Sequence, residues 1–577
     1  DDLPRPGALA AGPAFPADGA CRPTPAAGTA IRVPWGRAEP TTERTRPMIK
    51  TVSRRAALLA SLFLPLCGTL AAAPAQAEPL SLAVSAPPAS IDPHYYTLTP
   101  SIMLSSHIFS RLVQRDEKSR VVPDLAESWK LVDDTTWEFK LRPGVKFHNG
   151  ADFTAEDVAY SLERVPMVQS PSSFSVYTRD IADVQVVDPL TVRLKTNGPS
   201  PLLPANLANI FIVSRSVAAN SSTADFNSGK AAIGTGPYKF VSYDPNNRVK
   251  LARDDGYYGE KPAWETVDYR IISNDGARVA ALLSGDVALI DAVPTADAAR
   301  LRKDDRLTVA EANSTRLIFL GLDEERQEGS PDIAGPDGGK LEKNPLRDHR
   351  VREALSIAIN RPAIVSRVME GAALPSGQFM PPGVFGYDPS IPVPAFAPDR
   401  AKELLAQAGY PNGLSIILRG PNDRYVNDAQ IQQTVAQMWT RIGVRTRVEA
   451  QPLATVIGRL NRFEASAYLL GWSNSTGEPS SSLKAVLGTR DPALGRGLSN
   501  YGRYSNPEFD KLVQQALGTL DDKAREGLMQ KAMKMAMEDV AIIPLHLQKS
   551  VWAMRKGYAY TPRADEETRA MGLRPAK

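Results

Sequence analysis

Apolar and polar positions alternate in some parts of the chain and follow a helical period in others. Residues 80–85 (LSLAVS) alternate as a strand does, and 137–150 (WEFKLRPGVKFHNG) predicts two strands joined by a turn at 143–144. A helix is then expected from Thr154, a capping residue, to a stop at Pro166. The first part of the chain is therefore predicted to contain both strands and a helix.

The later segments of the chain are predicted to be richer in helix. Two alternating segments flank a turn at 245–247, and a strand (VRTRVEA) is expected after Gly443. Residues 325–340 are polar and rich in Gly and Pro, which predicts an exposed loop or linker. Helices are expected at 346–359, 400–408, 429–442 and from 506 onward. Because strands and helices alternate throughout, the predicted fold class is α/β.

Length and composition indicate an ordinary globular protein of several domains. At 577 residues the chain is too long for one core, and about three domains are expected. Apolar residues make up 43% and charged residues 23%, with 68 basic against 64 acidic side chains. No long run of one charge predicts binding to nucleic acid or to an anionic membrane.

The first 77 residues are expected to be a processed leader. Residues 1–47 read as a disordered or over-extended start, and 48–77 as a signal peptide with a basic beginning, an apolar run and a small-x-small site at 75–77. A membrane anchor is the alternative, but Pro65 interrupts a run that is already short for a span. Arg54 and Arg55 leave twin-arginine export open beside the general route. Both cysteines, Cys21 and Cys67, precede the predicted cleavage, so no disulfide is expected in the mature protein.

No stretch of the sequence carries a recognisable catalytic or metal-binding pattern. The five histidines are scattered singly, with no pair at helical spacing to hold a metal ion. GTGPYK at 234–239 has Lys where a dinucleotide loop needs Gly, and Tyr501 stands where a nucleophile elbow around Ser499 needs Gly. The sequence therefore predicts no enzyme, no cofactor and no metal, and a periplasmic hydrolase stays as a less favoured alternative.

Eight blocks of sequence follow one another along essentially all of the mature chain. They are SIDPH (90–94), VPDLAESW (122–129), WEFKLRPGVKFHNGADFTAEDVAYSLER (137–164), GTGPYKFVSYDP (234–245), RVREALSIAINRPAIV (350–365), LLAQAGYPNG (404–413), IGVRTRVE (442–449) and YSNPEFDKL (504–512). Gly234 and Gly236 in the fourth block are interpreted as a tight backbone turn. Taken in this order, the blocks resemble the family 5 extracellular solute-binding proteins, the dipeptide and oligopeptide binders of ABC importers.

The resemblance implies a fold and a set of domain boundaries. The expected fold is the two-lobed periplasmic binding protein fold of type II with an extra domain, in which a ligand cleft lies between lobes joined by a hinge. The expected segments are 78–115, which begins lobe I; 116–233, the extra domain inserted in lobe I; 234–330, which continues lobe I; 331–538, lobe II; and 539–577, which completes lobe I at the C-terminus.

The resemblance also implies a function. The chain is expected to be the periplasmic substrate-binding component of an ABC transporter, a monomer that captures a small polar solute, a peptide or peptide-like compound, for a permease in the inner membrane. The alternative within the family is a non-peptide solute such as an opine, a sugar or a metal complex. Either way, no nucleic acid partner is expected.

The loop GWSNSTGEPSSS (471–482) is the first candidate for the cleft. Its predicted ligand-binding residues are Trp472, Ser473, Asn474, Ser475 and Thr476. The resemblance places Ser475 where peptide-binding relatives present an Asp to the α-amino group, and a buried ammonium without a countercharge is costly. The loop therefore favours amide, hydroxyl or sugar-like groups. The alternative is a solvent loop rich in turn residues.

Two further segments are candidates. In RGPNDRYVNDAQ (419–430), Arg419 or Arg424 is predicted to clamp a ligand carboxylate and Tyr425 to stack on the ligand, although a helix-leading loop with solvated arginines is an equally good interpretation. Tyr95 and Tyr96 are a third, weaker candidate.

Overall fold

The computed structural model describes residues 79–577 except 171, 172, 331, 475 and 577. The predicted leader, with both cysteines, and Ser475 lie outside these residues. In the described ranges of the chain no helix is long and apolar enough to cross a membrane.

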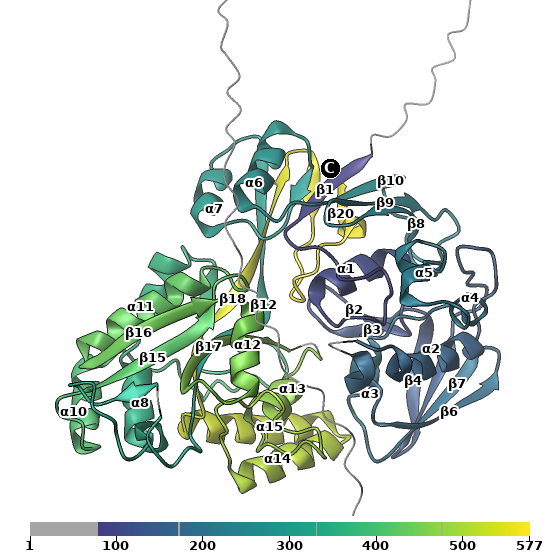
Figure 1. Ribbon diagram of the computed structural model, residues 1–577. Coiled ribbons are helices and arrows are strands. Elements are labelled where there is room, and N and C mark those ends of the chain that lie inside the picture. The colour runs from purple at the N-terminus through teal and green to yellow at the C-terminus, as the bar shows by residue number, and fades with distance from the viewer. Residues whose placement is uncertain (1–78, 171–172, 331, 475, 577) are drawn as a thin grey trace, which may run out of the picture. The chain divides into compact units, whose positions relative to one another are not determined.

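The largest element is a mixed sheet of twelve strands (Figure 1). Its strands, in spatial order, are β13 (Ile333–Ala334), β15 (Leu414–Pro421), β17 (Ala467–Ser473), β12 (Leu307–Leu322), β18 (Ile542–Arg555), β11 (Leu289–Ile290), β1 (Leu80–Val84), β10 (Thr266–Ile271), β9 (Arg248–Arg253) and β8 (Tyr238–Asp244), with β14 (Ala373–Pro375) on β18 and β16 (Val444–Gln451) on β15. β1 runs parallel to β10 and β11, and β15 runs parallel to β16 and β17, whereas β12 and β18 are antiparallel.

The two long central strands, β12 and β18, belong to two different cores. Near Leu307 and Val551 they pack in a core with β1 and β11, which we call lobe I. Beyond Leu317 they pack in a second core with β15 and β17, which we call lobe II. Their register shifts between Asn313 and Leu317, where β12 passes from one core to the other. We therefore propose that the hinge lies inside β12 and β18 rather than at the predicted boundaries 330/331 and 538/539.

A separate four-stranded antiparallel sheet lies within residues 116–233, the segment predicted to be the extra domain. Its order is β4 (Ala126–Asp133), β5 (Thr136–Leu141), β7 (Thr191–Thr196) and β6 (Ile181–Asp188). Helix α2 (Ala155–Met167) covers it, and Phe139, Val158 and Leu194 are among the side chains of its core. Thr154 caps α2 together with Asp157, as the capping pattern predicts.

The remaining elements complete the two lobes and their connections. Two short hairpins are formed by β2 (Val113–Arg115) with β3 (Val121–Pro123) and by β19 (Tyr558–Tyr560) with β20 (Leu573–Pro575). The other helices are α1 (Thr99–Ile108), α3 (Leu203–Leu207), α4 (Arg215–Ala218), α5 (Thr223–Asn227), α6 (Asp275–Ser284), α7 (Thr295–Arg302), α8 (His349–Ile357), α9 (Arg361–Ala363), α10 (Pro398–Gln407), α11 (Asp428–Arg441), α12 (Leu453–Asn461), α13 (Ser480–Ser482), α14 (Pro507–Gly518) and α15 (Asp522–Glu538). Short 3₁₀ turns are η1 (Phe174–Tyr177), η2 (Pro345–Arg347) and η5 (Ala570–Gly572), and π-helical turns are η3 (Ile364–Val368) and η4 (Leu483–Leu487).

Some sequence expectations about these elements are wrong. Residues 145–150 form no strand; they turn back so that Phe147 packs against Phe153, and β5 pairs with β4 and β7 instead. Pro166 lies inside the last turn of α2, which it does not stop.

Two other expectations fail for reasons of packing. The segment 325–340 is not wholly an exposed loop, because Ile333 is buried and β13 pairs with β15. Gly234 and Gly236 are required by close approach rather than by a turn, since a Cβ at either position would lie within 3.0 Å of the backbone of Ile108.

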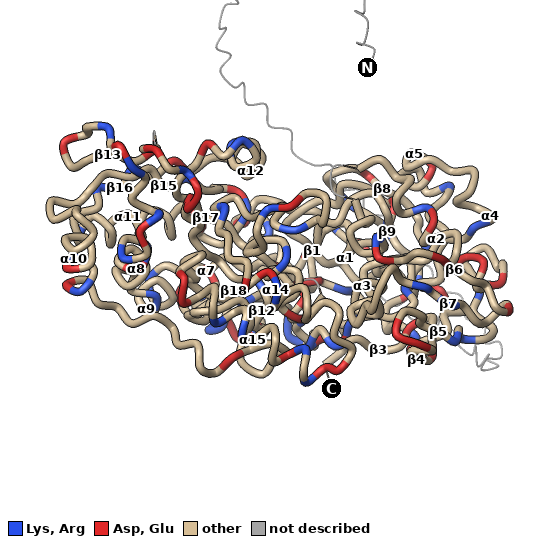
Figure 2. Tube along the Cα trace, turned by 90° about the horizontal axis from the view of Figure 1, so that it is seen from below, with Lys and Arg blue, Asp and Glu red and all other residues tan. Residues whose placement is uncertain are grey.

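Basic and acidic residues are interspersed along the described chain (Figure 2). This distribution agrees with the near balance of basic and acidic residues in the sequence.

Candidate functional site

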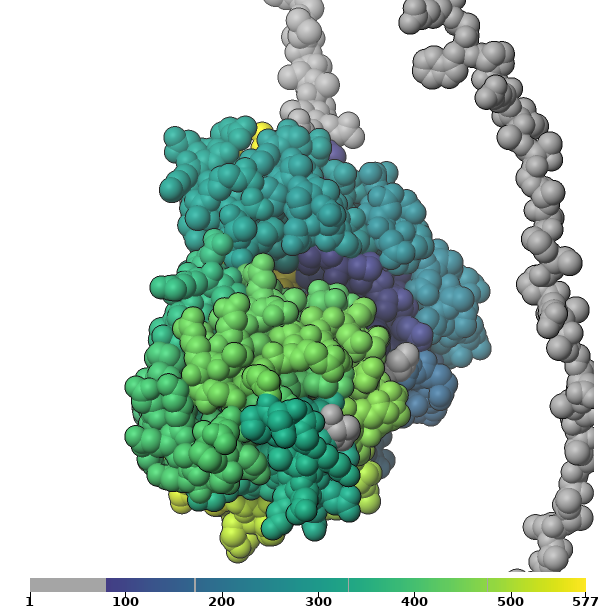
Figure 3. Space-filling model, turned by 60° about the vertical axis from the view of Figure 1, so that its left-hand side comes forward, coloured from purple at the N-terminus to yellow at the C-terminus, as the bar shows by residue number. Residues whose placement is uncertain are grey.

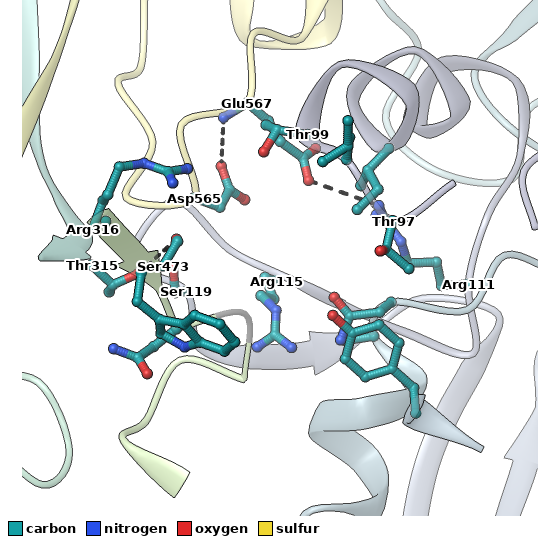
Figure 4. Close-up of a pocket in the computed structure, with 18 of the residues that line it drawn as sticks. Thr97, Thr99, Arg111, Arg115, Ser119, Thr315, Arg316, Ser473, Asp565 and Glu567 are labelled. Carbon is teal, nitrogen blue, oxygen red and sulfur yellow. Dashed lines mark hydrogen bonds and ion pairs between the residues drawn. The ribbon is translucent and has the colours of Figure 1, made fainter. Parts of the chain in front are cut away.

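A cavity of about 320 Å³ lies between lobe I and lobe II, on the side of the hinge where β17 ends (Figure 4). Its volume is within the range of small-molecule sites. Figure 3 shows the surface hollowed between the teal segment of lobe I and the green segment of lobe II. The cavity is lined by residues of the segments 97–102, 111–119, 208–209, 315–316, 471–474 and 565–569, together with Tyr177 and Arg424.

Cations outnumber acids in the lining. The acids are Asp565 and Glu567, both from the C-terminal segment. The cations are Arg111, Arg115, Arg316, Arg424 and Arg569. Such an excess of guanidinium groups favours a ligand with negative charge, provided that the arginines are not already neutralised by the protein.

The C-terminal segment neutralises some of this charge within lobe I. Glu567 accepts a hydrogen bond from Arg569 at 2.7 Å and lies 3.9 Å from Arg111. Burial alone would raise the pKa of Glu567, but the two arginines outweigh it and hold the pKa below its usual range. Asp565 is paired with Arg563 at 2.6 Å. Both lining acids are therefore engaged by arginines.

Arg316 is neutralised in the same way, at the crossing of the two lobes. Arg316 lies inside β12, at the point where the register shifts, and its Nε donates to Glu566 at 3.0 Å. A smaller hollow of about 190 Å³ lies beside this ion pair and is also lined by Thr99 and Arg424. The pair therefore belongs to the wall between two adjoining spaces.

Arg424 and Arg115 have no carboxylate partner among the described residues. Arg424 is exposed in the loop before α11, with its guanidinium 5.5 Å from the centre of the Tyr425 ring. Arg115, at the end of β2, is buried and donates from Nη2 to the carbonyl of Ala205 at 2.6 Å. These two guanidinium groups are the ones left for an anion that enters the cavity.

Comparison with known proteins identifies the family. Residues 120–493 match the model of bacterial extracellular solute-binding proteins, family 5 (middle region). The chain belongs to this family. Its members are binding proteins rather than enzymes, and they work in the periplasm.

Individual relatives cover most of the family 5 chain. The dipeptide-binding protein of Escherichia coli K12 is 27% identical over 521 residues, which are 85% of this chain and 93% of the relative. Heme-binding protein A of Haemophilus influenzae is 27% identical over 472 residues, 76% of this chain and 82% of the relative. The structure of the periplasmic binding protein DppA of Helicobacter pylori in complex with the peptide STSA matches with a TM-score of 0.72 at 25% identity, covering 87% of this chain and 98% of that one. The two-lobed fold of family 5 is thereby confirmed.

The family 5 chain brings some of the predicted site residues together at the cavity. Trp472, Ser473 and Asn474 line it where β17 ends, and Arg424 lines it from lobe II. Asn474 is held by its own loop, since its amide donates to Met380 Sδ at 3.4 Å and accepts from Ser481 at 3.2 Å. Ser475 lies outside the described residues.

Other predicted site residues lie away from the cavity lining. Thr476 is buried and donates to the carbonyl of Glu478, whose carboxylate is paired with Arg525 at 2.9 Å. Tyr425 donates to the carbonyl of Gly471 at 3.1 Å, behind the lining.

Arg419 and the two N-terminal tyrosines are also placed outside the lining. Arg419 is buried against Asp332, at 2.8 Å, and against Glu449. Tyr95 and Tyr96 precede the lining residues 97–102 and are half-buried. The sequence around Arg419 carries no pattern that would indicate its two partners, because Asp332 and Glu449 come from other segments.

Several lining residues were missed by reasoning from sequence. Arg115 stands in a charged hairpin that resembles any exposed turn, and Asp565 and Glu567 stand in a charged run near the C-terminus. Arg316 carried a usable signal, because it is a lone cation beside the apolar strand residues 317–322. A cation at the edge of a buried strand needs a partner, here Glu566.

The histidines do not contribute to the cavity. His94, His107 and His546 are buried, and burial lowers the pKa of each to about 4. His148 and His349 bond to the backbone carbonyls of Gly236 and Glu538. Within the described ranges no three His, Cys, Asp or Glu side chains are grouped so as to hold a metal ion.

Proposed function

We propose that this family 5 protein captures a small polar solute with at least one carboxylate, a peptide or peptide-like compound, and delivers it to an ABC permease in the inner membrane. The observation that carries the proposal is Arg424, whose guanidinium lines the cavity with no carboxylate or hydrogen-bond partner among the described residues. Arginine binds carboxylates through two parallel hydrogen bonds, which gives both affinity and orientation. The relatives named for dipeptides and for a bound peptide support this substrate class.

A second candidate is a peptide-like solute without a protonated amine, such as an opine. It is favoured by the state of the acids that would have to bind such an amine. Both lining acids, Asp565 and Glu567, are already engaged by arginines. An ammonium group bound beside them would compete with these ion pairs. A relative named for heme shows that the family is not confined to peptides.

Capture is proposed to occur by rotation of the lobes about β12 and β18. The ligand would bind between residues 111–119 of one side and 471–474 of the other, and the closed form would be presented to the permease. Residues 48–77 are proposed to direct export and to be cleaved after Ala77. The protein is proposed to act as a monomer.

Native mass spectrometry of residues 78–577, purified from the periplasm without denaturation, tests the proposal. A bound mass that is released on unfolding, carries a carboxylate and is lost in Arg424→Met is the expected result. Retention of a ligand without any acidic group, or equal retention by Arg424→Met, contradicts it. The presence or absence of a free amine in the released compound decides between the two candidate solutes.

A further inference from the structure

Arg115 is a buried cation with an unsatisfied nitrogen. The residue is only 7% exposed, Nη2 donates to the carbonyl of Ala205, and Nη1 has no hydrogen-bond partner among the described residues. No acidic side chain of the described chain comes within 4.0 Å of it. Burial accordingly lowers the pKa of this guanidinium.

No other buried arginine of the described residues is left in this state. Arg361 also lacks a carboxylate, but Nε donates to the carbonyl of Pro544, Nη1 to that of Ser356 and Nη2 to the hydroxyl of Ser356. The remaining buried arginines each lie within 4.0 Å of a carboxylate; they are Arg111, Arg164, Arg278, Arg316, Arg352, Arg419, Arg525, Arg563 and Arg569. The exception at Arg115 therefore calls for a partner from outside the protein.

The unsatisfied nitrogen lies beside the loop that lines the cavity. Nη1 is 3.5 Å from the position that a Cβ would occupy at Gly477, in the loop that follows Asn474. In Figure 4 Arg115 lies in the middle of the view, apart from Asp565 and Glu567. Arg115 lines both the cavity and a larger hollow of about 740 Å³, and its Nη1 lies beside Gly477, three residues after the lining residue Asn474.

Arg115 and Arg424 approach the cavity from different regions of the chain. Arg115 ends β2, near the start of the described chain, whereas Arg424 precedes α11 of lobe II. A solute with an anionic group at each end would tie the two sides together, and each buried or cavity-facing guanidinium would gain its counterion. A solute with one carboxylate would leave Arg115 buried and unpaired.

We infer that Arg115 binds a second carboxylate of the solute, so that the preferred ligand is a peptide-like dicarboxylate. This inference rests on the proposed function, in which Arg424 binds the first carboxylate. It narrows the substrate class from carboxylated solutes to those with an acidic side chain or an equivalent second acid.

The test uses the mature protein and a mixture of short peptides in which each member with Glu has a twin with Gln. After gel filtration, native mass spectrometry reads which members are retained and titration gives their affinities. In the wild type we expect Glu peptides to bind about tenfold or more tightly than their Gln twins. Arg115→Met is expected to abolish this preference by weakening the binding of the Glu peptides.

A matched control is Arg120→Met, which removes the same charge from an exposed arginine of the same hairpin, paired with Asp116. It is expected to keep the preference for Glu. Equal binding of the twins by the wild type overturns the inference while leaving the proposed function intact, and this comparison does not depend on the folding of any variant. Retention of no peptide at all overturns the peptide-like character of the proposed solute, and the inference with it.

Discussion

The C-terminal segment 563–569 and the pair Arg115 and Arg424 both bring charge to the cavity, but they differ in what balances it. In the segment, Asp565, Glu566 and Glu567 each meet an arginine within 3.0 Å. Arg115 and Arg424 meet no carboxylate among the described residues. The number of charges in a cavity thus says little about its ligand, whereas the charges left unpaired indicate which groups the ligand must bring.

The largest expected effect comes from breaking the paired region. Glu567→Gln leaves Arg111 buried without its counterion and leaves Arg569 only the more distant Asp565, at 3.8 Å. Removal of one partner from a buried ion pair costs about 3 kcal/mol or more. Urea unfolding of the mature protein should show this loss at pH 7. Glu117→Gln, which removes a half-exposed acid 3.7 Å from Arg563, serves as the control and should cost less than about 1 kcal/mol. Equal costs for the two variants would mean that the segment is not held by its buried pairs.

The next effect concerns the unpaired region. Arg424→Met removes an exposed cation that has no carboxylate partner among the described residues and only the Tyr425 ring beside it, so the free energy of unfolding should change by less than about 1 kcal/mol. The affinity for the retained solute should fall about 30-fold, the value of a charge-assisted interaction of about 2 kcal/mol. Thermal unfolding and titration calorimetry measure the two quantities. A large loss of stability with unchanged affinity would mean that Arg424 stabilises the fold and does not bind the ligand.

A third variant separates unpaired groups that line the cavity from those that do not. His546 is fully buried in β18, both ring nitrogens lack partners among the described residues, and it does not line the cavity. His546→Leu should therefore raise the free energy of unfolding by about 1 kcal/mol at pH 7 and leave ligand affinity unchanged.

The gain from His546→Leu should grow at lower pH. Burial lowers the pKa of His546 to about 4 from 6.5, so between these values the unfolded chain binds a proton that the native protein does not. The contribution of this residue to stability therefore falls as the pH drops from 6.5 to 4, and the variant should lack that fall. The free energies of unfolding of the wild type and of His546→Leu at pH 7 and pH 5 measure this growth. A change in ligand affinity in the variant would contradict the separation between unpaired groups that line the cavity and those that do not.

The sequence predicted the fold better than the site for a physical reason. Strand and helix patterns are local, so β1 and the cap at Thr154 could be predicted from neighbouring residues. The partners of Arg419 and Arg115 come from distant segments, and local patterns carry no information about them. The same residue type in two similar polar contexts therefore became a structural ion pair in one case and an unpaired cavity residue in the other.

The smallest expected effect tests whether the two unpaired arginines differ in their access to solvent. Arg424 is exposed and Arg115 is 7% exposed, so salt should screen the first more than the second. When the ionic strength rises from about 0.05 M to about 0.5 M, the affinity for a Gln peptide should fall by about threefold, because that peptide relies on Arg424. The preference for its Glu twin should persist, because the second carboxylate meets a buried guanidinium that ions in solution reach poorly. If the preference disappears in step with the overall affinity, the second carboxylate is bound at an exposed position and Arg115 is not its partner.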